Sequence, residues 1–214
     1  MVNINIVPPL IFIAFSAFPL LVNYFLKRKY KRLIEKLHET EDDYYHQFIF
    51  VSFINFDCRQ HLIDKRECGE HCSYNYQQTL VRFMASAKSS ICLCMYTFSM
   101  RDINVELIKA HKRGASVRII ADQIMLKTDV AKHNLTFLKN SGVPLKVQPN
   151  NQSMMHHKFC LIDKEDRDSA KMFFGSMNLT TQGLVSNFDN VVLTNNSTMI
   201  QRFSEEFEEL WANF

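Results

Sequence analysis

The sequence predicts an α/β fold, a mixed β-sheet flanked by helices on both faces, and three observations support this prediction. The 214 residues are enough for one ordinary domain but not for two full ones. Hydrophobic residues make up 47% of the chain, with only 5 Gly and 5 Pro, which excludes a disordered or collagen-like protein. From about Asn75 onward, short apolar runs of strand type alternate with stretches of helical periodicity. Such alternation is typical of a sheet covered by helices.

Four stretches have the apolar spacing of amphipathic helices. In the last of them, Ile200, Phe203 and Phe207 recur at intervals that place them on one side of a helix. Gly114 and Gly142 follow the second and third stretches and are typical helix ends. The predicted helices cover residues 77–88, 104–113, 129–140 and 198–212.

Short runs rich in β-branched, aromatic and other apolar residues predict the strands between these helices. The run 90–98 is continuously apolar over most of its length, as in a strand buried on both faces, and Cys92, Cys94 and Cys160 should therefore be core residues. Residues 40–76 are less regular. The predicted strands cover residues 90–98, 116–121, 143–147, 156–162, 171–174 and 190–193.

Residues 7–26 form an uncharged apolar run long enough to cross a membrane as a helix. A cleaved secretory signal is not expected, because no positive charge precedes the run. A buried core helix is the alternative, but Pro8, Pro9 and Pro19 argue against a soluble helix. We therefore predict an N-terminal transmembrane helix with its basic flank over residues 1–32 and a folded domain over residues 33–214.

The charge distribution predicts the orientation of that anchor. The chain carries 25 basic and 22 acidic residues, and five of the basic ones follow the apolar run directly. Positive residues at one end of a span favour keeping that end in the cytosol, so the folded domain should face the cytosol. The rest of the chain has 20 basic against 22 acidic residues, so any nucleic acid must bind in a local groove. The five basic residues are Lys27, Arg28, Lys29, Lys31 and Arg32.

A polar loop over residues 57–73 contains three cysteines and two histidines. Cytosolic cysteines are more often thiols or metal ligands than disulfides, and zinc would give this loop the cohesion that it lacks. Four ligands would make the site closed and structural. The spacing fits no standard zinc finger, and incidental thiols are the alternative. The predicted ligands are Cys58, Cys68, His71 and Cys72, with His61 as the alternative to His71.

Phosphoryl chemistry is indicated by His156 and Lys158. On a strand, residues two apart point to the same side, so these two side chains should emerge together while His157 faces the other way. An imidazole can attack phosphorus or carry a proton near neutral pH, and an ammonium group neutralises a phosphate oxygen.

A second polar segment follows, with Ser176 and Asn178 as candidate phosphate-binding residues and Asp189 as a candidate partner for the other ring nitrogen of His156. A lone histidine or lysine on a strand is usually structural, but the combination favours a catalytic site.

The two segments together resemble the signature of the phospholipase D superfamily, the HKD motif. It is carried by His156-x-Lys158-x4-Asp163, followed by Gly175-Ser176-x-Asn178-x-Thr180-x2-Gly183-x3-Asn187-x-Asp189. The resemblance covers about residues 75–214. Two features depart from the family: the interval between Asp163 and Gly175 is longer, and Asp189 stands where Glu is commoner.

The resemblance implies a phosphodiesterase with His156, Lys158, Asp163 and Asp189 as motif members of the catalytic set. Strand parity turns Asp163 away from His156, which predicts a structural ion pair for that carboxylate. The family reaction uses two histidines, one forming a phosphohistidine and one protonating the leaving oxygen. Since the chain holds one copy of the motif, a homodimer with a shared active site is implied, with no catalytic metal.

The anchor, the Cys/His loop and the single motif together resemble the mitochondrial members of that superfamily. That resemblance implies a protein of the outer mitochondrial membrane that faces the cytosol and cleaves single-stranded RNA in the biogenesis of PIWI-interacting RNAs. Cleavage of cardiolipin to phosphatidic acid is the alternative. The polar residues ahead of His156, among them Lys127, Lys132, Lys146 and Gln148, favour RNA. A membrane-tethered binding protein with a relic site is a third possibility, which a His156→Ala variant would distinguish.

Overall fold

The computed structural model describes residues 19–34, 44–149 and 153–214. The chain divides into two compact units, 1–44 and 45–214. The described part of the first unit is a helix over residues 19–34. Within the described ranges, no helix combines the length and the apolar character needed to cross a membrane. The predicted span 7–26 lies mainly outside the described residues, so the transmembrane helix stays a prediction.

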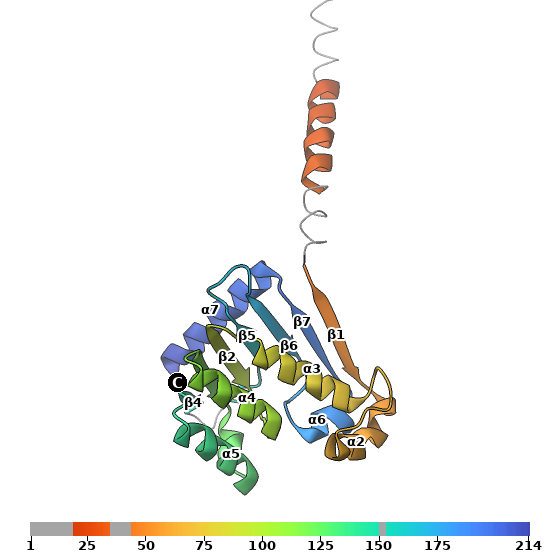
Figure 1. The fold of residues 1–214 in the computed structure, drawn as a ribbon. Helices are drawn as coiled ribbons and strands as arrows, with labels where there is room; N and C mark the ends of the chain where they lie inside the picture. Colours follow the sequence, from red (N-terminus) through yellow and green to blue (C-terminus); the bar gives the residue numbers. More distant parts are fainter. Residues whose placement is uncertain (1–18, 35–43, 150–152) are drawn as a thin grey trace, which may run out of the picture. The chain divides into compact units, whose positions relative to one another are not determined.

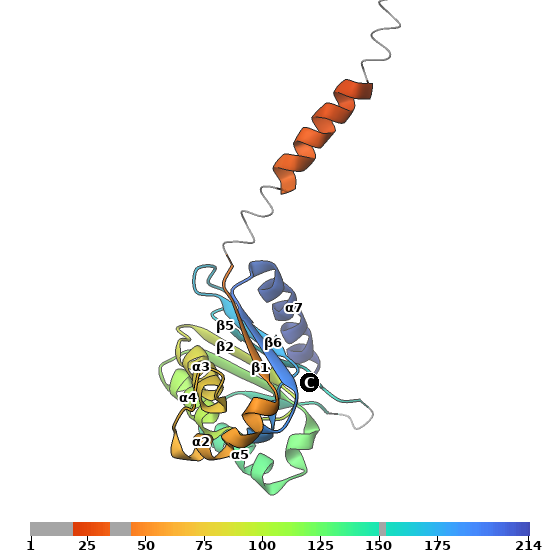
Figure 2. The ribbon, with the colours of Figure 1, turned by 90° about the vertical axis from the view of Figure 1, so that its right-hand side faces the viewer.

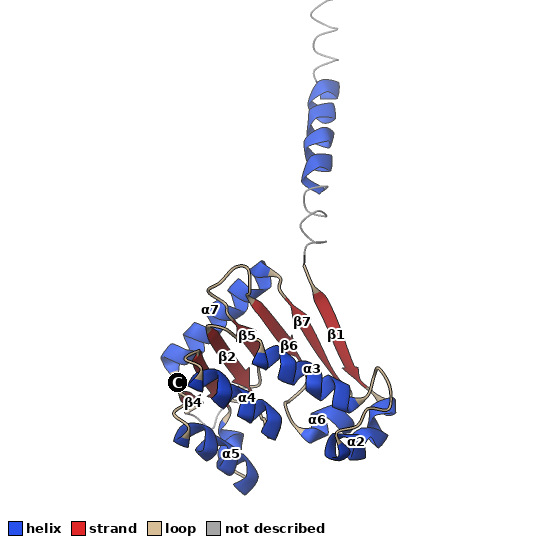
Figure 3. Ribbon diagram, viewed as in Figure 1, coloured by secondary structure: helices blue, strands red, loops and turns tan. Residues whose placement is uncertain are grey.

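The second unit is built on one seven-stranded sheet in the order β1-β7-β6-β5-β2-β3-β4 (Figures 1 and 3). The pairs β2–β3 and β3–β4 are parallel and the other four are antiparallel, which confirms a mixed sheet. The strands are β1 (His46–Val51), β2 (Ser90–Met95), β3 (Ser116–Ala121), β4 (Leu145–Val147), β5 (Lys158–Ile162), β6 (Lys171–Gly175) and β7 (Asp189–Thr194).

Helices cover both faces of this sheet, as predicted (Figure 2). One face carries α3 (Ser73–Ala85), α4 (Arg101–Lys112), α5 (Asp129–Asn140) and α6 (Thr181–Val185). The long helix α7 (Ser197–Asn213) packs on the other face.

Side chains from the two faces of the central strands belong to two separate hydrophobic clusters. On β2, Ile91 and Leu93 point to the α3–α4 side, while Cys92 and Cys94 point to the α7 side. This two-residue alternation explains why β2 is apolar throughout, since neither of its faces meets water. Cys160 is also fully buried, so all three cysteines are core residues as predicted.

The edge strand β1 was not predicted. It lies in the stretch 40–76 that looked irregular, and it pairs antiparallel with β7. Its inward residues Ile49 and Val51 are buried, but Phe48 and Phe50, which alternate with them, are 59% and 62% exposed. The residues of β1 are therefore apolar on both faces although β1 is an edge strand. The alternation of apolar and polar residues that would indicate an edge strand is missing from the sequence.

A small layer that contains the Cys/His loop, called the Cys/His layer, follows β1 and packs against α3. It consists of the 3-10 helix η1 (Phe53–Cys58), the short helix α2 (Arg59–Asp64) and the loop that leads into α3. A second 3-10 helix, η2 (Gln123–Leu126), follows β3.

Candidate active site and candidate metal centre

The candidate catalytic residues meet at one end of the sheet. Because β5, β6 and β7 are successive antiparallel neighbours, the start of β5, the end of β6 and the start of β7 lie at the same end. His156 precedes β5, Ser176 follows β6 and Asp189 begins β7. The topology thus brings together residues that are 33 positions apart in the sequence.

His156 and Lys158 form a contacting pair, as predicted. The Lys158 Nζ lies 3.2 Å from His156 Nδ1 and donates a hydrogen bond of 2.7 Å to the His156 carbonyl oxygen. The His156 ring is exposed, whereas Lys158 is only 7% exposed. His157 faces the other way and contacts Glu206 on α7 at 3.1 Å. The sheet therefore presents the imidazole to solvent with an ammonium group beside it.

Partial burial lowers the pKa of His156 below its usual value, and the nearby positive charge of Lys158 lowers it further. Burial also lowers the pKa of Lys158, against the opposing charge of Asp189. A lowered imidazole pKa favours the neutral form, which is the form that can attack phosphorus.

Among the described residues, no hydrogen bond joins Asp189 to His156, so that contact stays a prediction. The Asp189 carboxylate accepts hydrogen bonds from Ser176 Oγ at 2.6 Å and from Asn187 Nδ2 at 3.0 Å. Ser176 Oγ also accepts one from the backbone N–H of Asn190, so this hydroxyl holds Asp189 rather than standing free. The Asp189 carboxylate is thus bound by Ser176 and Asn187, and it acts on Lys158 through its charge.

Two glycines of the motif are explained by close backbone contacts. A Cβ at Gly175 would clash with the carbonyl oxygen of Asn190, and one at Gly183 would clash with the carbonyl oxygen of Asn178. Both glycines therefore allow the segment that carries Ser176 and Asn178 to lie against its neighbours. The Asn178 Oδ1 atom is buried and has no hydrogen-bond partner among the described residues.

Asp163 lies at the opposite end of β5 from His156, and the described residues form no ion pair of 4.0 Å or less with its carboxylate. Its carboxylate accepts hydrogen bonds from the backbone N–H groups of Lys88, Ser89 and Ser90. The residue has a φ of 50°, at the turn that ends β5. The backbone N–H groups at the start of β2 compensate this buried carboxylate, so Asp163 is a structural residue of the motif.

Two supporting residues of the site were not predicted. The Tyr96 ring lies 4.5 Å from the His156 ring, and Lys158 Nζ lies 5.1 Å from the centre of the Tyr96 ring. The Asp122 carboxylate, 2% exposed, accepts a hydrogen bond of 2.8 Å from the backbone N–H of Met155 and so holds the residue before His156. Asp122 follows the parallel strand β3, and functional side chains often lie at the carboxyl ends of parallel strands. This position could have indicated Asp122 from the sequence.

A cleft of about 530 Å³ adjoins the site through Tyr96 and Asn178. Its lining contains no charged side chain and combines hydroxyl and amide groups, such as Thr128 and Gln182, with apolar ones such as Met125. Lys146, predicted as part of a polar groove, instead bonds to the Trp211 carbonyl oxygen and stacks on its ring.

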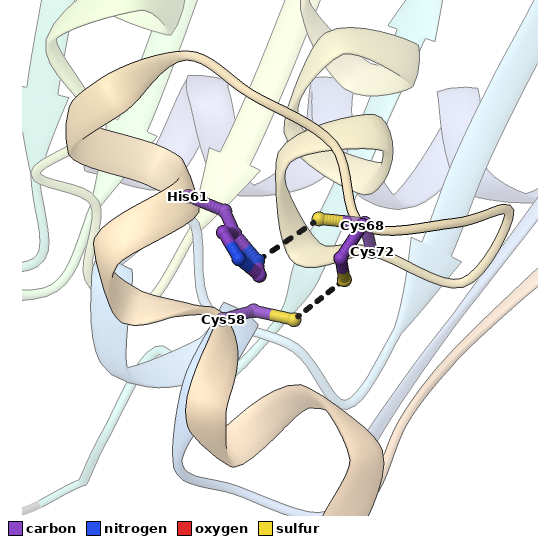
Figure 4. A group of neighbouring side chains, drawn as sticks. All are labelled: Cys58, His61, Cys68 and Cys72. Atoms are coloured by element: carbon purple, nitrogen blue, oxygen red, sulfur yellow. Dashed lines mark hydrogen bonds between the residues drawn. The ribbon is translucent and has the colours of Figure 1, made fainter.

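The Cys/His loop forms a compact cluster with His61, not His71, as its histidine (Figure 4). The ligand atoms of Cys58, His61, Cys68 and Cys72 all lie within 4.8 Å of one another. The His71 Nδ1 lies 3.2 Å from Tyr76 Oη instead. The histidine of the cluster is His61 because α2 places it beside the three cysteines. The His71 ring instead contacts Tyr76 on α3.

Two of the spacings between these atoms match a tetrahedral zinc site. Zinc at its usual bond lengths separates two sulfurs by roughly 3.8 Å, and a sulfur and a nitrogen by roughly 3.6 Å. The structure has 3.8 Å between the sulfurs of Cys58 and Cys68, and 3.6 Å between Cys72 Sγ and His61 Nδ1. Three sulfurs and one ring nitrogen are also the donors that zinc prefers, and they would leave no open position.

A mixed sheet that presents a paired histidine and lysine at one end is a candidate site for phosphoryl transfer. Residues 80–211 match the family model described as "Cardiolipin synthase, PLD-like domain". The chain therefore belongs to the phospholipase D-like family.

The relatives agree with this membership. The chain is 32% identical over 162 residues to the mitochondrial cardiolipin hydrolase of Drosophila melanogaster, covering 69% of this chain and 63% of that protein. It is 31% identical over 150 residues to the mouse protein of the same name, covering 68% and 64%. The aligned part thus spans less than two thirds of the length of these relatives.

Solved structures share the fold. The phospholipase D family member Nuc from Salmonella typhimurium superposes with a TM-score of 0.62 and 24% identity, covering 79% of this chain and 95% of that one. NucT from Helicobacter pylori also gives a TM-score of 0.62, at 15% identity, covering 79% and 97%.

Proposed function

We propose that this protein is a phosphodiesterase whose active site is completed by a second copy of the chain. The observation that carries this proposal is the single His156–Lys158 pair, which stands beside Asp189 and Ser176 at one end of the sheet. One neutral histidine can attack phosphorus, but a second group must protonate the leaving oxygen. In a homodimer the partner's His156 supplies that proton.

The proposed reaction has two balanced steps. In the first, a bond forms between His156 and phosphorus while the bond to the leaving oxygen breaks, and the partner's His156 donates its proton to that oxygen. In the second, water attacks phosphorus and loses a proton to the same partner histidine, while the bond between His156 and phosphorus breaks and frees His156. Lys158 neutralises a non-bridging oxygen in both steps, so the chemistry requires no catalytic metal. With RNA as substrate the products carry a 5′-phosphate and a 3′-hydroxyl.

An exposed aromatic surface supports the homodimer. Phe48 and Phe50 lie on the α7 side of the sheet at its edge and are exposed, with their rings stacked 6.4 Å apart. Phe188, next to Asp189, is 63% exposed and contacts Phe53 at 4.7 Å. Exposed apolar patches of this kind usually mark interaction sites. A second copy is the occupant that would both cover this surface and complete the adjacent site.

Single-stranded RNA is the substrate that we propose. The uncharged polar cleft beside Tyr96 suits a ribose and base next to the cleaved phosphate, and its hydroxyl and amide groups are a poor lining for an acyl chain. The resemblance to the Zucchini members of the family supports a role in the biogenesis of PIWI-interacting RNAs. Hydrolysis of cardiolipin is the second candidate, favoured by the name of the relatives.

The remaining parts of the proposal concern location and metal. We propose an N-terminal anchor over residues 7–26 in the outer mitochondrial membrane, with the folded domain in the cytosol. Mitochondrial relatives and the basic residues after the apolar run support this location. We further propose that Cys58, His61, Cys68 and Cys72 hold a structural zinc ion.

The test compares the full chain with its His156→Ala variant on end-labelled single-stranded RNA and, separately, on cardiolipin vesicles. A His133→Ala variant, altered on the exposed face of α5, serves as the matched control. RNA cleavage with 5′-phosphate ends that is lost only in His156→Ala supports the proposal. Lipid turnover without RNA cleavage would transfer the assignment to cardiolipin hydrolysis, and a cyclic phosphate product would overturn the phosphohistidine mechanism.

A further inference from the structure

Two buried polar side chains hold the backbone directly before His156. Asp122 is 2% exposed and Gln148 is 5% exposed. The backbone N–H of Met155 donates to Asp122 Oδ2 at 2.8 Å and to Gln148 Oε1 at 3.2 Å. Gln148, predicted among the polar residues that favour RNA, is therefore an interior residue. We call Asp122 and Gln148 together the Met155 clamp.

Each member of the clamp is fixed by the parallel part of the sheet. Asp122 directly follows β3, and its Oδ1 accepts a hydrogen bond of 2.8 Å from the backbone N–H of Ile124. Gln148 directly follows β4, and its backbone N–H donates to the Ala121 carbonyl oxygen at 3.0 Å. The Gln148 Nε2 also donates to the Ser153 carbonyl oxygen at 2.7 Å. The clamp thereby connects the chain ahead of β5 to the ends of β3 and β4.

The backbone on the other side of His156 is held as well. The backbone N–H of Tyr96 donates to the His157 carbonyl oxygen at 2.9 Å, and the Tyr96 ring lies 4.5 Å from the His156 ring. The Lys158 Nζ donates to the His156 carbonyl oxygen at 2.7 Å. The exposed imidazole is thus carried by a backbone that is fixed both before and after it.

A carboxylate suits position 122 because two backbone donors use its two oxygens separately. An amide would offer one oxygen and turn its own donor toward the second N–H group. Burial of a charge is costly, and no ion pair of 4.0 Å or less joins Asp122 to a described residue. The negative charge of Asp122 also acts on the His156 imidazole, where it opposes the charge of Lys158.

We propose that Asp122 and Gln148 are positioning residues of the active site, which hold Met155 so that the His156 imidazole meets the substrate phosphate in a fixed orientation. The proposal rests on the proposed phosphodiesterase function and adds two residues that lie outside the HKD motif. Both are almost fully buried, so they act through Met155. A displacement of an attacking group by about 1 Å can cost about 100-fold in rate, so a fixed backbone at this point has a large effect on kcat.

The kinetic test measures kcat and KM of the full chain on single-stranded RNA and on bis(p-nitrophenyl) phosphate. Asp122→Asn and Gln148→Met should each lower kcat by about tenfold or more and leave KM within about twofold. The matched control is Thr194→Val, because Thr194 is fully buried and its Oγ1 accepts the backbone N–H of Asn196 at the far end of β7. It should lower stability and keep kcat within about twofold of the wild type.

NMR titration separates the two members of the clamp. Burial and the charge of Lys158 lower the pKa of His156, whereas the charge of Asp122 raises it. Asp122→Asn should therefore lower the pKa of His156, and Gln148→Met, which removes no charge, should leave it unchanged. The titratable groups that act on the His156 ring or contact it are Lys158, Asp122, His157 and Tyr96.

The ring signals of His156, assigned by their loss in His156→Ala, report orientation without turnover. In both clamp variants they should move toward the values of a free histidine, because the contact with the Tyr96 ring is no longer fixed. If the wild type cleaves neither substrate, the proposed function fails and these signals alone decide whether the clamp fixes the ring. Gln148→Met keeps the test decisive if Asp122→Asn does not fold.

Two results would overturn the proposal. One is a loss of stability in both variants with kcat and the His156 signals unchanged, as expected for Thr194→Val. The other is a raised KM with unchanged kcat, which would assign Asp122 and Gln148 to substrate binding instead of positioning.

Discussion

At the scale of single residues, Lys158 determines the chemistry of its neighbour. Its Nζ contacts both the ring and the carbonyl oxygen of His156, while Tyr96 supports the ring from one side. The same ammonium group that would neutralise a phosphate oxygen also disfavours protonation of the imidazole. The proposed nucleophile, His156, and the proposed phosphate-binding group, Lys158, therefore affect each other directly.

This pairing predicts the titration of His156. Its imidazole should titrate below the ordinary value of 6.5 in NMR spectra, because burial and the Lys158 charge both disfavour the imidazolium. The proposed reaction needs a neutral His156 and, in protonated form, the partner's His156, so activity should peak where one of the two is protonated. It should fall at lower pH as both become protonated and at higher pH as both become neutral. Lys158→Met should shift the titration upward. A His156 pKa above 6.5 that does not respond to Lys158→Met would contradict this account.

The environment of Asp163 predicts that its substitution changes the free energy of unfolding but not the catalytic rate. Burial alone would raise the pKa of its carboxyl, but the hydrogen bonds from the backbone N–H groups of Ser90, Ser89 and Lys88 hold the pKa below its usual value. The carboxylate therefore stabilises the fold above the pKa of the unfolded chain, and this contribution is lost as the pH falls through the folded pKa.

Asp163→Asn should lower the free energy of unfolding at pH 7 by about 1–3 kcal/mol, because backbone donors lose a charged acceptor. Urea denaturation measures this loss, and kcat of the folded fraction should stay within about twofold of the wild type. A kcat reduced by orders of magnitude at normal stability would instead return Asp163 to the catalytic set.

At the scale of secondary-structure elements, the sequence was most informative where one periodicity dominates. The bounds of β3 and α5 agree with the prediction, because each is a regular run between glycine or polar residues. The strand β1 was not predicted, because its exposed residues Phe48 and Phe50 are apolar and the run lacks the alternation of a half-buried strand. Within the site, the His156–Lys158 pair follows from strand parity, whereas the Ser176–Asp189 contact depends on how β6 and β7 align, which spacing alone does not reveal.

The Cys/His layer predicts which histidine binds zinc. His61→Ala should lose the bound zinc, whereas His71→Ala should retain about one ion per chain, because His71 contacts Tyr76 instead of the cluster. Inductively coupled plasma mass spectrometry of the purified variants gives this ratio. Zinc retained in His61→Ala but lost in His71→Ala would restore the original ligand set.

Removal of the metal should loosen the layer formed by η1, α2 and the start of α3. A strong chelator should lower the melting temperature by at least about 5 °C, since 1 kcal/mol corresponds to about 2–4 °C for a domain of this size. The four ligands stand apart from His156, so readdition of zinc should restore the melting temperature together with any lost activity. No change in melting temperature on chelation would indicate incidental thiols.

At the scale of the whole molecule, the two ends of the sheet differ in the side chains that they carry. The His156 end carries the reactive groups and adjoins the uncharged cleft. The Asp163 end carries the start of the domain at Tyr45 and a second cavity of about 580 Å³. Antiparallel pairing of β5 and β6 separates the two ends by the length of a strand.

The exposed aromatic surface predicts the oligomeric state. Phe50→Asp should convert a dimer to a monomer and reduce activity at least tenfold, because a charge would be buried without a partner in the proposed interface. Analytical ultracentrifugation and RNA cleavage are measured on the same sample. Phe137→Asp, at an exposed apolar position on α5 outside the cleft, is the matched control and should remain dimeric and active. A fully active Phe50→Asp monomer would show that the single chain holds a complete site.

Mixing subunits tests whether one reaction uses both histidines. If each turnover needs His156 from both copies, unfolding and refolding wild type with an equal amount of His156→Ala leaves about a quarter of the dimers fully active, since random pairing produces that share of wild-type pairs. Activity per total protein should then fall to about a quarter of that of the same amount of wild type. If one histidine suffices, mixed dimers retain one working site and activity falls only to about half. A value near one half would therefore reject the shared two-histidine site even if the protein proves to be a dimer, because dimerisation and joint catalysis are separate properties of the same surface.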